Sequence, residues 1–411
     1  MSRENTMKPD PSESVFASAE EKPESGLVQR LKSKLRDFLT ARREEQDISQ
    51  DEFRLLTVRQ LMWRKFARHK VALASGVVLI FLYLVTMFAG FVAPRHPQAA
   101  DATFSWAPPQ RVRFRDPETG EWSLRPFVYP LEGERSLVTL RREYTEDRST
   151  RDYIRLFVRG DEYKLLGLFK TDVHLFGTES GNLYLFGADV RGRDLFSRCI
   201  IGGRISLTIG FLGVFISVVL GSVIGAASGY AGGVMDMVTQ RIIEFIRSFP
   251  TLPLWMALAA AIPITWPPEA VYAGIISVLG FLGWTGLARE VRGKVLSLRE
   301  EDFVYYAESS GASTWRILRK HLVPNMLSHI LVTATLAIPV TILGESSLSF
   351  LGLGVRPPMV SWGLLLNEAI KIQIVSLYPW TLFPAIFIWT AVMAFNFLGD
   401  GLRDALDPFA R

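Results

Sequence analysis

Long runs of apolar residues decide what this chain can fold into. The runs are about twenty residues long, the length that a helix needs to cross roughly 30 Å of hydrocarbon. A soluble chain of 411 residues would instead spread its apolar residues over short alternating elements. We therefore predict an all-α protein that crosses the membrane several times. Its net charge of +5 comes largely from basic residues beside the apolar runs, which indicates cytoplasmic loops and not nucleic-acid binding.

Six transmembrane helices are predicted. Their approximate ranges are 71–93, 205–227, 244–264, 270–287, 327–348 and 380–398. Gly, Ala, Ser or Pro interrupt several of these runs, and small residues let helix backbones approach closely. Basic residues crowd the approach to the first run and the loop between the fourth and fifth. That side is therefore predicted to be cytoplasmic, with both termini inside.

The segments between these runs divide the chain into parts. Residues 1–70 are predicted to be a polar cytoplasmic tail ending in an amphipathic helix, with a plain basic anchor as the alternative. Residues 71–93 are the first span. Residues 94–204 contain short alternating stretches bounded by Pro and Gly, which predict a mainly β or mixed extracytoplasmic insertion between the first two helices. Residues 205–411 would hold five spans and a polar cytoplasmic loop at 297–324.

The sequence lacks the motifs of common catalytic and metal sites. It has one cysteine, Cys199, and five scattered histidines without the spacing of metal ligands. No Gly-x4-Gly-Lys-Ser/Thr phosphate loop occurs, so nucleotide hydrolysis would have to come from another polypeptide. No nucleophile elbow or zinc-protease motif supports a hydrolase. We expect a non-catalytic chain that binds no metal and no cofactor of its own.

The polar stretch “DFVYYAESSGASTWRILRKHLVPN” lies between the fourth and fifth runs. Its helical periodicity predicts a short amphipathic helix that docks into a cytoplasmic partner, with a solvated connecting loop as the alternative. Gly311 would allow a tight turn, and Pro324 would keep the loop helix from running on into the next span. Trp315 is the large aromatic anchor that protein interfaces favour. Further apolar contacts to the partner are expected from Val304, Ala307, Ile317 and Leu318.

This stretch resembles the helix-turn-helix signature of ATP-binding-cassette importer permeases. Gly311 is followed after nine residues by His321, and Pro324 closes the motif. The first three positions of that signature, Glu-Ala-Ala, are occupied here by Tyr305, Tyr306 and Ala307, so only Ala307 matches among these three. The blocks “GESSLSFLGLGVRPPMVSWGLLL” and “FNFLGDGLRDALDPF” are similar to the second-permease (C-type) subunits of dipeptide and oligopeptide importers. “GADVRGRDLFSRCIIGGRISLTIG” and “GYAGGVMDMVTQRIIEFIRSFPTLPL” are similar to the same subfamily.

The resemblance to this peptide/opine/nickel family implies a type I importer permease fold with six helices in a bacterial inner membrane. It implies a homologous second permease subunit, two ATP-binding-cassette ATPase subunits that use ATP and Mg, and a periplasmic substrate-binding protein. The lipid bilayer is the remaining partner, and no nucleic acid is expected. Peptides are the expected cargo, and an opine, a nickel chelate or an oligosaccharide is the alternative.

The resemblance also points to residues with specific roles. Contact with the ATPase subunit is expected at Tyr305, Tyr306, Ala307, Gly311, Ala312, Ser313, Trp315, His321 and Pro324. Glu345 lies towards the outer end of the fifth run, and a carboxylate within a span is a functional candidate. Ser346 and Ser349 offer it hydrogen bonds, so we favour a role in a gate or in packing over a proton relay.

Two other classes of protein remain as alternatives. An ion-driven secondary transporter would need ionisable residues along the centres of the spans, and these are almost free of charge. A membrane-anchored binding or sensory module built on residues 94–204 would not need five further spans. Both alternatives are therefore less favoured than an importer permease.

Overall fold

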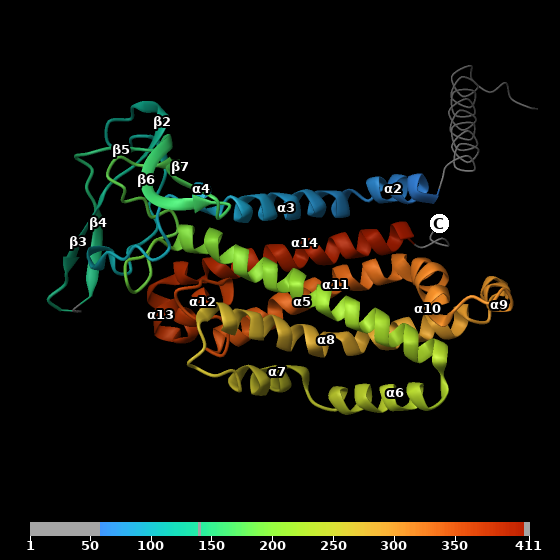
Figure 1. Ribbon diagram of the computed structural model, residues 1–411. Coiled ribbons are helices and arrows are strands. Elements are labelled where there is room, and N and C mark those ends of the chain that lie inside the picture. The colour runs from blue at the N-terminus through green and yellow to red at the C-terminus, as the bar shows by residue number, and fades with distance from the viewer. Residues whose placement is uncertain (1–57, 139–140, 407–411) are drawn as a thin grey trace, which may run out of the picture. The chain divides into compact units, whose positions relative to one another are not determined.

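The computed structural model describes residues 58–138 and 141–406 (Figure 1). The predictions for the tail at residues 1–57 lie outside these described residues. The chain divides into two compact units, residues 1–64 and residues 65–411. The segment before the first span is helical, as α2 (Val58–Arg68). The remaining elements all belong to the second unit.

The second unit is built mainly from long apolar helices. Five stretches in the described part of the chain are long and apolar enough to cross a membrane, and there are six if one bent helix pair counts as a span. The long helices are α3 (Lys70–Met87), α5 (Leu195–Ala231), α8 (Pro268–Leu298), α11 (Val323–Phe350) and α14 (Phe383–Leu406). Figure 1 shows them lying alongside one another.

The prediction that residues 244–264 form a single helix is wrong. This segment is divided between α6 (Gly233–Arg247) and α7 (Thr251–Ala260), whose axes differ by 85°. The break falls just before Pro250. Proline has no N–H to donate and disfavours helical geometry in the preceding residue, so α6 ends there.

The insertion between α4 (Ala89–Val92) and α5 contains seven strands in its described residues, which exclude 139–140. Antiparallel pairing gives a three-stranded sheet in the order β1-β2-β5 and two hairpins, β3-β4 and β6-β7. The strands are β1 (Arg113–Arg115), β2 (Trp122–Val128), β3 (Leu131–Arg135), β4 (Arg142–Glu146), β5 (Asp152–Tyr153), β6 (Arg155–Leu165) and β7 (Phe169–Gly177).

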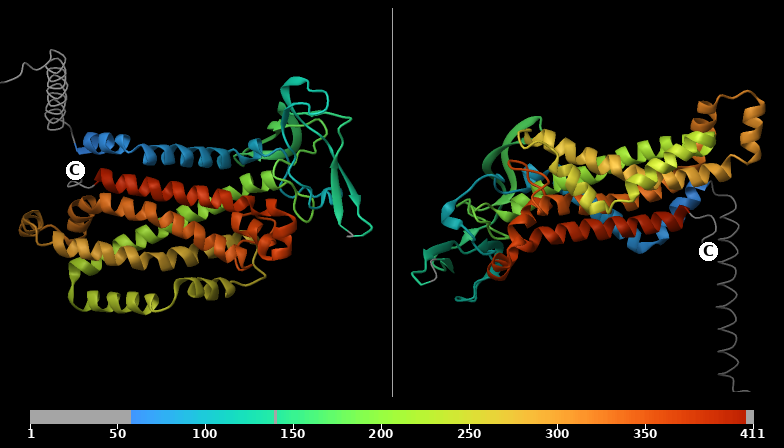
Figure 2. Two further views of the ribbon diagram at one scale, coloured as in Figure 1. Left: turned by 180° about the vertical axis from the view of Figure 1, so that it is seen from behind. Right: turned by 90° about the horizontal axis from the view of Figure 1, so that it is seen from below.

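Short elements complete the two ends of the helical bundle. At the strand end lie η2 (Ala102–Phe104), α12 (Trp362–Asn367), η4 (Glu368–Ile370), α13 (Ile372–Leu377) and η5 (Pro379–Leu382). At the other end lie α9 (Asp302–Ser309), α10 (Thr314–Ile317) and the π-helical turn η3 (Leu318–Leu322). The views in Figure 2 confirm that the strands and α9 occupy opposite ends of the long helices.

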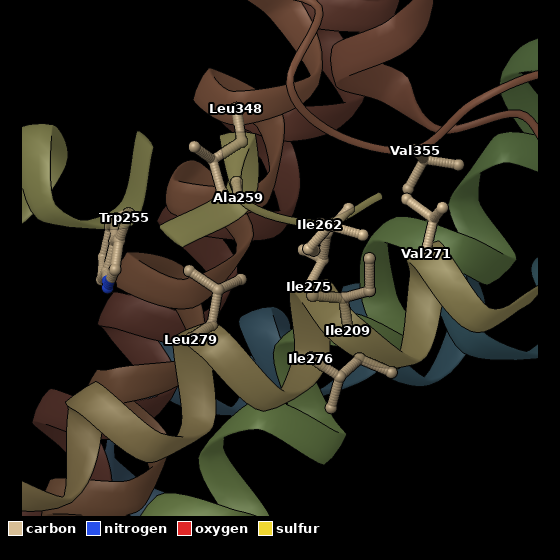
Figure 3. Packing of buried hydrophobic residues seen from close by; sticks show 10 residues of the cluster. All are labelled: Ile209, Trp255, Ala259, Ile262, Val271, Ile275, Ile276, Leu279, Leu348 and Val355. Atoms are coloured by element: carbon tan, nitrogen blue, oxygen red, sulfur yellow. The ribbon is translucent and has the colours of Figure 1, made fainter. Parts of the chain in front are cut away.

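The interior combines apolar side chains with direct backbone contact. Figure 3 shows one apolar cluster between α5, α7, α8 and α11, with Leu279, Ile209 and Leu348 among its members. On α5, glycines at positions 221, 225 and 229 are spaced four residues apart and face α8. A β-carbon at Gly225 would overlap the carbonyl oxygen of Ala288. The two helices therefore approach as closely as their backbones allow, as small residues permit in membranes.

This contact predicts that Gly225→Ala destabilises the protein. The added methyl group has no space against α8, so the free energy of unfolding should fall by about 1–3 kcal/mol. Gly293→Ala on α8 is the matched control, because no atom lies within 4 Å of its β-carbon position. That control should be neutral or slightly stabilising. Thermal unfolding of the detergent-purified variants tests this, and equal midpoints for both variants would contradict it.

Candidate functional site

The polar loop between α8 and α11 folds as two short helices separated by a tight turn. Gly311 has φ +74°, a left-handed conformation that favours glycine. Its N–H donates to the carbonyl of Glu308 (2.9 Å), and the N–H of Ala312 donates to the carbonyl of Ala307 (3.0 Å). These two bonds form a Schellman motif at the end of α9. Because no atom lies within 4 Å of the Gly311 β-carbon position, conformation and not space requires glycine here.

One face of this loop is fixed to the helical bundle. Val304 and Ile317 are buried in an apolar cluster that includes Val291 and Val295 of α8. The hydroxyl of Tyr230, at the end of α5, donates to Glu308 (2.7 Å). Val304, Ile317 and Leu318 are buried against the bundle, so the expectation that they supply apolar contacts to a partner is wrong. Ala307 packs against the same cluster but is only half-buried, and its contact with a partner stays a prediction.

The opposite face carries the large side chains that the sequence singles out. Tyr305, Tyr306 and Trp315 are 67%, 68% and 63% exposed, respectively. Ser313 is also exposed and precedes the first residue of α10. Ala312 is half-buried beside the same apolar cluster. The candidate residues therefore separate into an exposed aromatic group and small residues that shape the turn.

Pro324 does not separate the loop from the next span, and this prediction is wrong. The helix continues from Thr314 through η3 into α11 as one stretch. At η3 the N–H of Val323 bonds to the carbonyl of Leu318, five residues earlier. This wider turn precedes the proline, whose ring would otherwise press on the carbonyl four residues before it. His321 lies half-buried in η3, with its ring 6.5 Å from that of Phe303.

A bidentate ion pair near this loop is not evident from the sequence. Arg292 on α8 donates through Nε and Nη2 to the two carboxylate oxygens of Asp236, each at 2.5 Å. Ser228 on α5 donates to the same carboxylate (2.6 Å). The pair joins α5, α6 and α8, but 56 residues separate its two members. The sequence signal for this ion pair is Arg292 itself, because a charged residue in a largely apolar helix needs a partner.

Glu345 forms a second candidate site near the opposite end of α11. Its side chain is fully buried, and both carboxylate oxygens accept hydrogen bonds. Ser206 of α5 donates to one oxygen (3.0 Å), and Ser349 donates to the other (2.7 Å). The hydroxyls of Ser346 and Ser361 also face this carboxylate. Serine hydroxyls from α5, α11 and the following loop therefore surround it.

The same serines connect Glu345 to the segment that follows α11. Ser206 Oγ accepts the N–H of Trp362 (3.1 Å), and Ser349 Oγ accepts the N–H of Val355 (3.1 Å). The indole N–H of Trp362 donates to the carbonyl of Cys199 (2.8 Å). The carboxylate thus fixes the turn between α11 and α12 against α5.

Two protein families match the chain in separate segments. Residues 217–411 match the family described as binding-protein-dependent transport system inner membrane component. Residues 57–109 match the N-terminal TM domain of oligopeptide transport permease C. The dipeptide transport system permease protein DppC of Lactococcus lactis is 34% identical over 350 residues, which is 85% of this chain and 90% of that protein. The chain belongs to the binding-protein-dependent permease family.

Other relatives match the permease over slightly more than half of its length. The oligopeptide transport system permease protein OppC of Haemophilus influenzae is 46% identical over 226 residues, covering 55% of this chain and 70% of that protein. OppC of Escherichia coli is 46% identical over 231 residues, covering 56% and 73%. A solved amino acid ABC transporter overlaps 47% of this chain and 92% of its own at a TM-score of 0.32 and 18% identity.

The serine network predicts unequal losses of stability for two substitutions at Glu345. Glu345→Ala removes the acceptor for two buried hydroxyls, so the free energy of unfolding should fall by about 1–3 kcal/mol. Glu345→Gln keeps one acceptor oxygen and nearly the same volume, so it should lose less. Thermal unfolding in detergent measures both variants. Equal losses would show that the hydrogen bonds to the side-chain oxygens contribute nothing measurable.

Proposed function

We propose that this permease is a transmembrane subunit of an ATP-driven importer for peptides or related small solutes. Family membership supports the transport role. The named relatives are oligopeptide and dipeptide transport permeases, which supports peptides as the cargo. An opine, a nickel chelate or an oligosaccharide is the alternative cargo, because a separate binding protein would select the solute.

The observation that carries the coupling mechanism is the division of the polar loop into two faces. Tyr305, Tyr306 and Trp315 project from α9 and α10, while the other face is fixed to α5 and α8. Exposed aromatic side chains on a rigid support are typical anchors of protein interfaces. An ATPase subunit that binds these aromatics would pull on α9, and the buried cluster would pass the displacement to the long helices. ATP and Mg would act on that subunit.

The proposed assembly contains this chain, a homologous second permease, two ATPase subunits and a substrate-binding protein. The chain would lie in a bacterial inner membrane, with residues 1–70, the loop at 297–324 and both termini in the cytoplasm. Residues 94–204 would then be extracytoplasmic, where the strands offer a surface for the binding protein. Alternating access between two such bundles would move the solute.

The structure of the Glu345 site favours this proposal over an ion-driven carrier. A proton relay needs a chain of groups that pass protons between them. Glu345 instead has its two oxygens held by serine hydroxyls that also bind backbone N–H groups. We therefore propose that it supports a gate or the packing of α5 against α11.

Replacing the exposed aromatics should weaken ATPase binding without affecting the fold. For the triple variant Tyr305→Ala, Tyr306→Ala and Trp315→Ala, we expect at least about a tenfold loss of affinity, because aromatic anchors commonly contribute 2 kcal/mol or more. Trp122→Ala is the control, because Trp122 is also a largely exposed aromatic residue but lies on β2. The measurement is co-purification of ATPase subunits with the tagged chain from native membranes, together with the ATP hydrolysis of the complex.

Two results would contradict the proposal. The first is unchanged recovery of ATPase subunits by a correctly inserted triple variant, which would mean that the aromatics do not bind them. The second is recovery of the wild-type chain alone in several mild detergents, combined with uptake that an ionophore abolishes. That result would favour an ion-driven carrier.

A further inference from the structure

One cavity lies outside both candidate sites. It has a volume of about 400 Å³ and opens between the β6–β7 hairpin, α4 and the first turns of α5. Three cationic side chains line the cavity, together with one carboxylate, that of Glu162. The cations are Lys164, Lys170 and Arg204. The cavity therefore favours an anion at the end of the α3–α4 segment.

The two lysines are placed unfavourably unless an anion lies between them. Lys164 and Lys170 are directly opposite each other in the register of β6 and β7. Like charges directly opposite on paired strands destabilise a hairpin. Among the described residues, neither ammonium group has a carboxylate within salt-bridge distance. Arg204 is held in place, since it donates to the carbonyls of Thr86 (2.7 Å) and Met87 (2.8 Å) at the end of α3.

The hairpin turn beyond these lysines is apolar and exposed. Leu166, Leu168 and Phe169 are 43%, 75% and 67% exposed. Leu166 has φ +51° and Gly167 has φ +76°. Two successive left-handed residues are typical of hairpin turns, where Asn or Asp is favoured first and leucine is strained. An apolar turn of this kind is unfavourable in water and suits a hydrocarbon environment.

Contacts with α4 place this turn at the depth of α3. His174 Nδ1 lies 2.6 Å from the carbonyl oxygen of Ala93, and the Tyr163 ring packs directly on Gly90. The hairpin therefore runs back along α4 towards α3, and it lies beside α4 in Figure 1. Strands rise about 3.3 Å per residue, so the turn lies roughly 10 Å beyond Tyr163. At that distance from Tyr163, along a hairpin that runs towards α3, the turn is expected beside the end of α3.

We propose that residues 165–169 insert into the membrane leaflet at this end of the helices and that the cavity binds the phosphate of an anionic phospholipid. Lys164 and Lys170 would bind the phosphate oxygens, while the acyl chains lie against Leu168 and Phe169. Basic residues at a membrane surface attract anionic lipids, and apolar side chains anchor a segment in the leaflet. This inference requires that the chain spans a membrane and is independent of the cargo.

The depth of the turn can be measured with a fluorescent label. The one native cysteine, Cys199, is buried, so Leu168→Cys can be labelled selectively in the full chain. Leu137→Cys is the matched control, an exposed leucine after β3 in a hairpin that lies apart from α3 (Figure 1). In nanodiscs we expect brominated acyl chains to quench the label at 168 and aqueous iodide to quench the label at 137. Equal iodide quenching at both positions would overturn insertion of the turn.

Lipid binding can be tested by substituting the lysines. The variant Lys164→Gln and Lys170→Gln is compared with Arg111→Gln and Arg159→Gln, which removes the same charge from exposed positions of the insertion. Each full-length chain is extracted from membranes of phosphatidylglycerol and phosphatidylcholine, and the retained lipid is counted by native mass spectrometry. We expect the lysine variant to retain several-fold less phosphatidylglycerol and the arginine variant to match the wild type.

Free phosphate provides the remaining arm of the test. Wild-type protein should keep its phosphatidylglycerol in excess inorganic phosphate, because the acyl chains contribute to binding. Displacement of the lipid by phosphate would show that the cavity takes a free anion, which overturns the lipid assignment. Equal phosphatidylglycerol retention by the lysine variant and the wild type would likewise overturn it.

Discussion

The close contact between α5 and α8 determines where both candidate sites lie. The 37 residues of α5 extend for about 55 Å at 1.5 Å per residue, so this helix reaches from one site to the other. Near its start, Ser206 binds Glu345, and near its end, Tyr230 binds Glu308 of the loop. Glycines on α5 bring α8 against it, and α8 leads directly into α9. A displacement of the loop therefore acts on a helix that also contacts the Glu345 network.

Features that depend on local sequence are the ones that could be predicted. The apolar runs predict the long helices because crossing hydrocarbon requires a continuous apolar segment. Gly311 predicts the tight turn because glycine readily adopts left-handed conformations, and its φ in the structure is +74°. Alternating apolar and polar residues predict the strands between residues 113 and 177. Two failures also have local causes. Pro250 divides the third apolar run, and the π-helical turn before Pro324 lets a helix continue where proline was expected to end it.

Features that depend on contacts between distant residues could not be predicted from one sequence. The spacing of apolar residues does not distinguish whether Val304 and Ile317 pack against a partner or against the chain's own helices. Both kinds of packing would bury their side chains. The ion pair between Arg292 and Asp236 depends on the packing of α6 near α8, and no sequence motif predicts it. Glu345 stands out in the sequence as a carboxylate in an apolar run, but its contact with Ser206 spans 139 residues of sequence.

The two ends of the molecule expose apolar side chains that suit different surroundings. At the loop, Tyr305 and Trp315 combine an apolar ring with a polar group, which suits an interface that forms in water. At the hairpin, Leu168 and Phe169 have no polar atoms in their side chains and lie between two paired lysines, Lys164 and Lys170. This arrangement suits the boundary between headgroups and hydrocarbon. The chemistry of the exposed residues, and not their exposure alone, therefore distinguishes the proposed protein-binding surface from the proposed lipid-binding one.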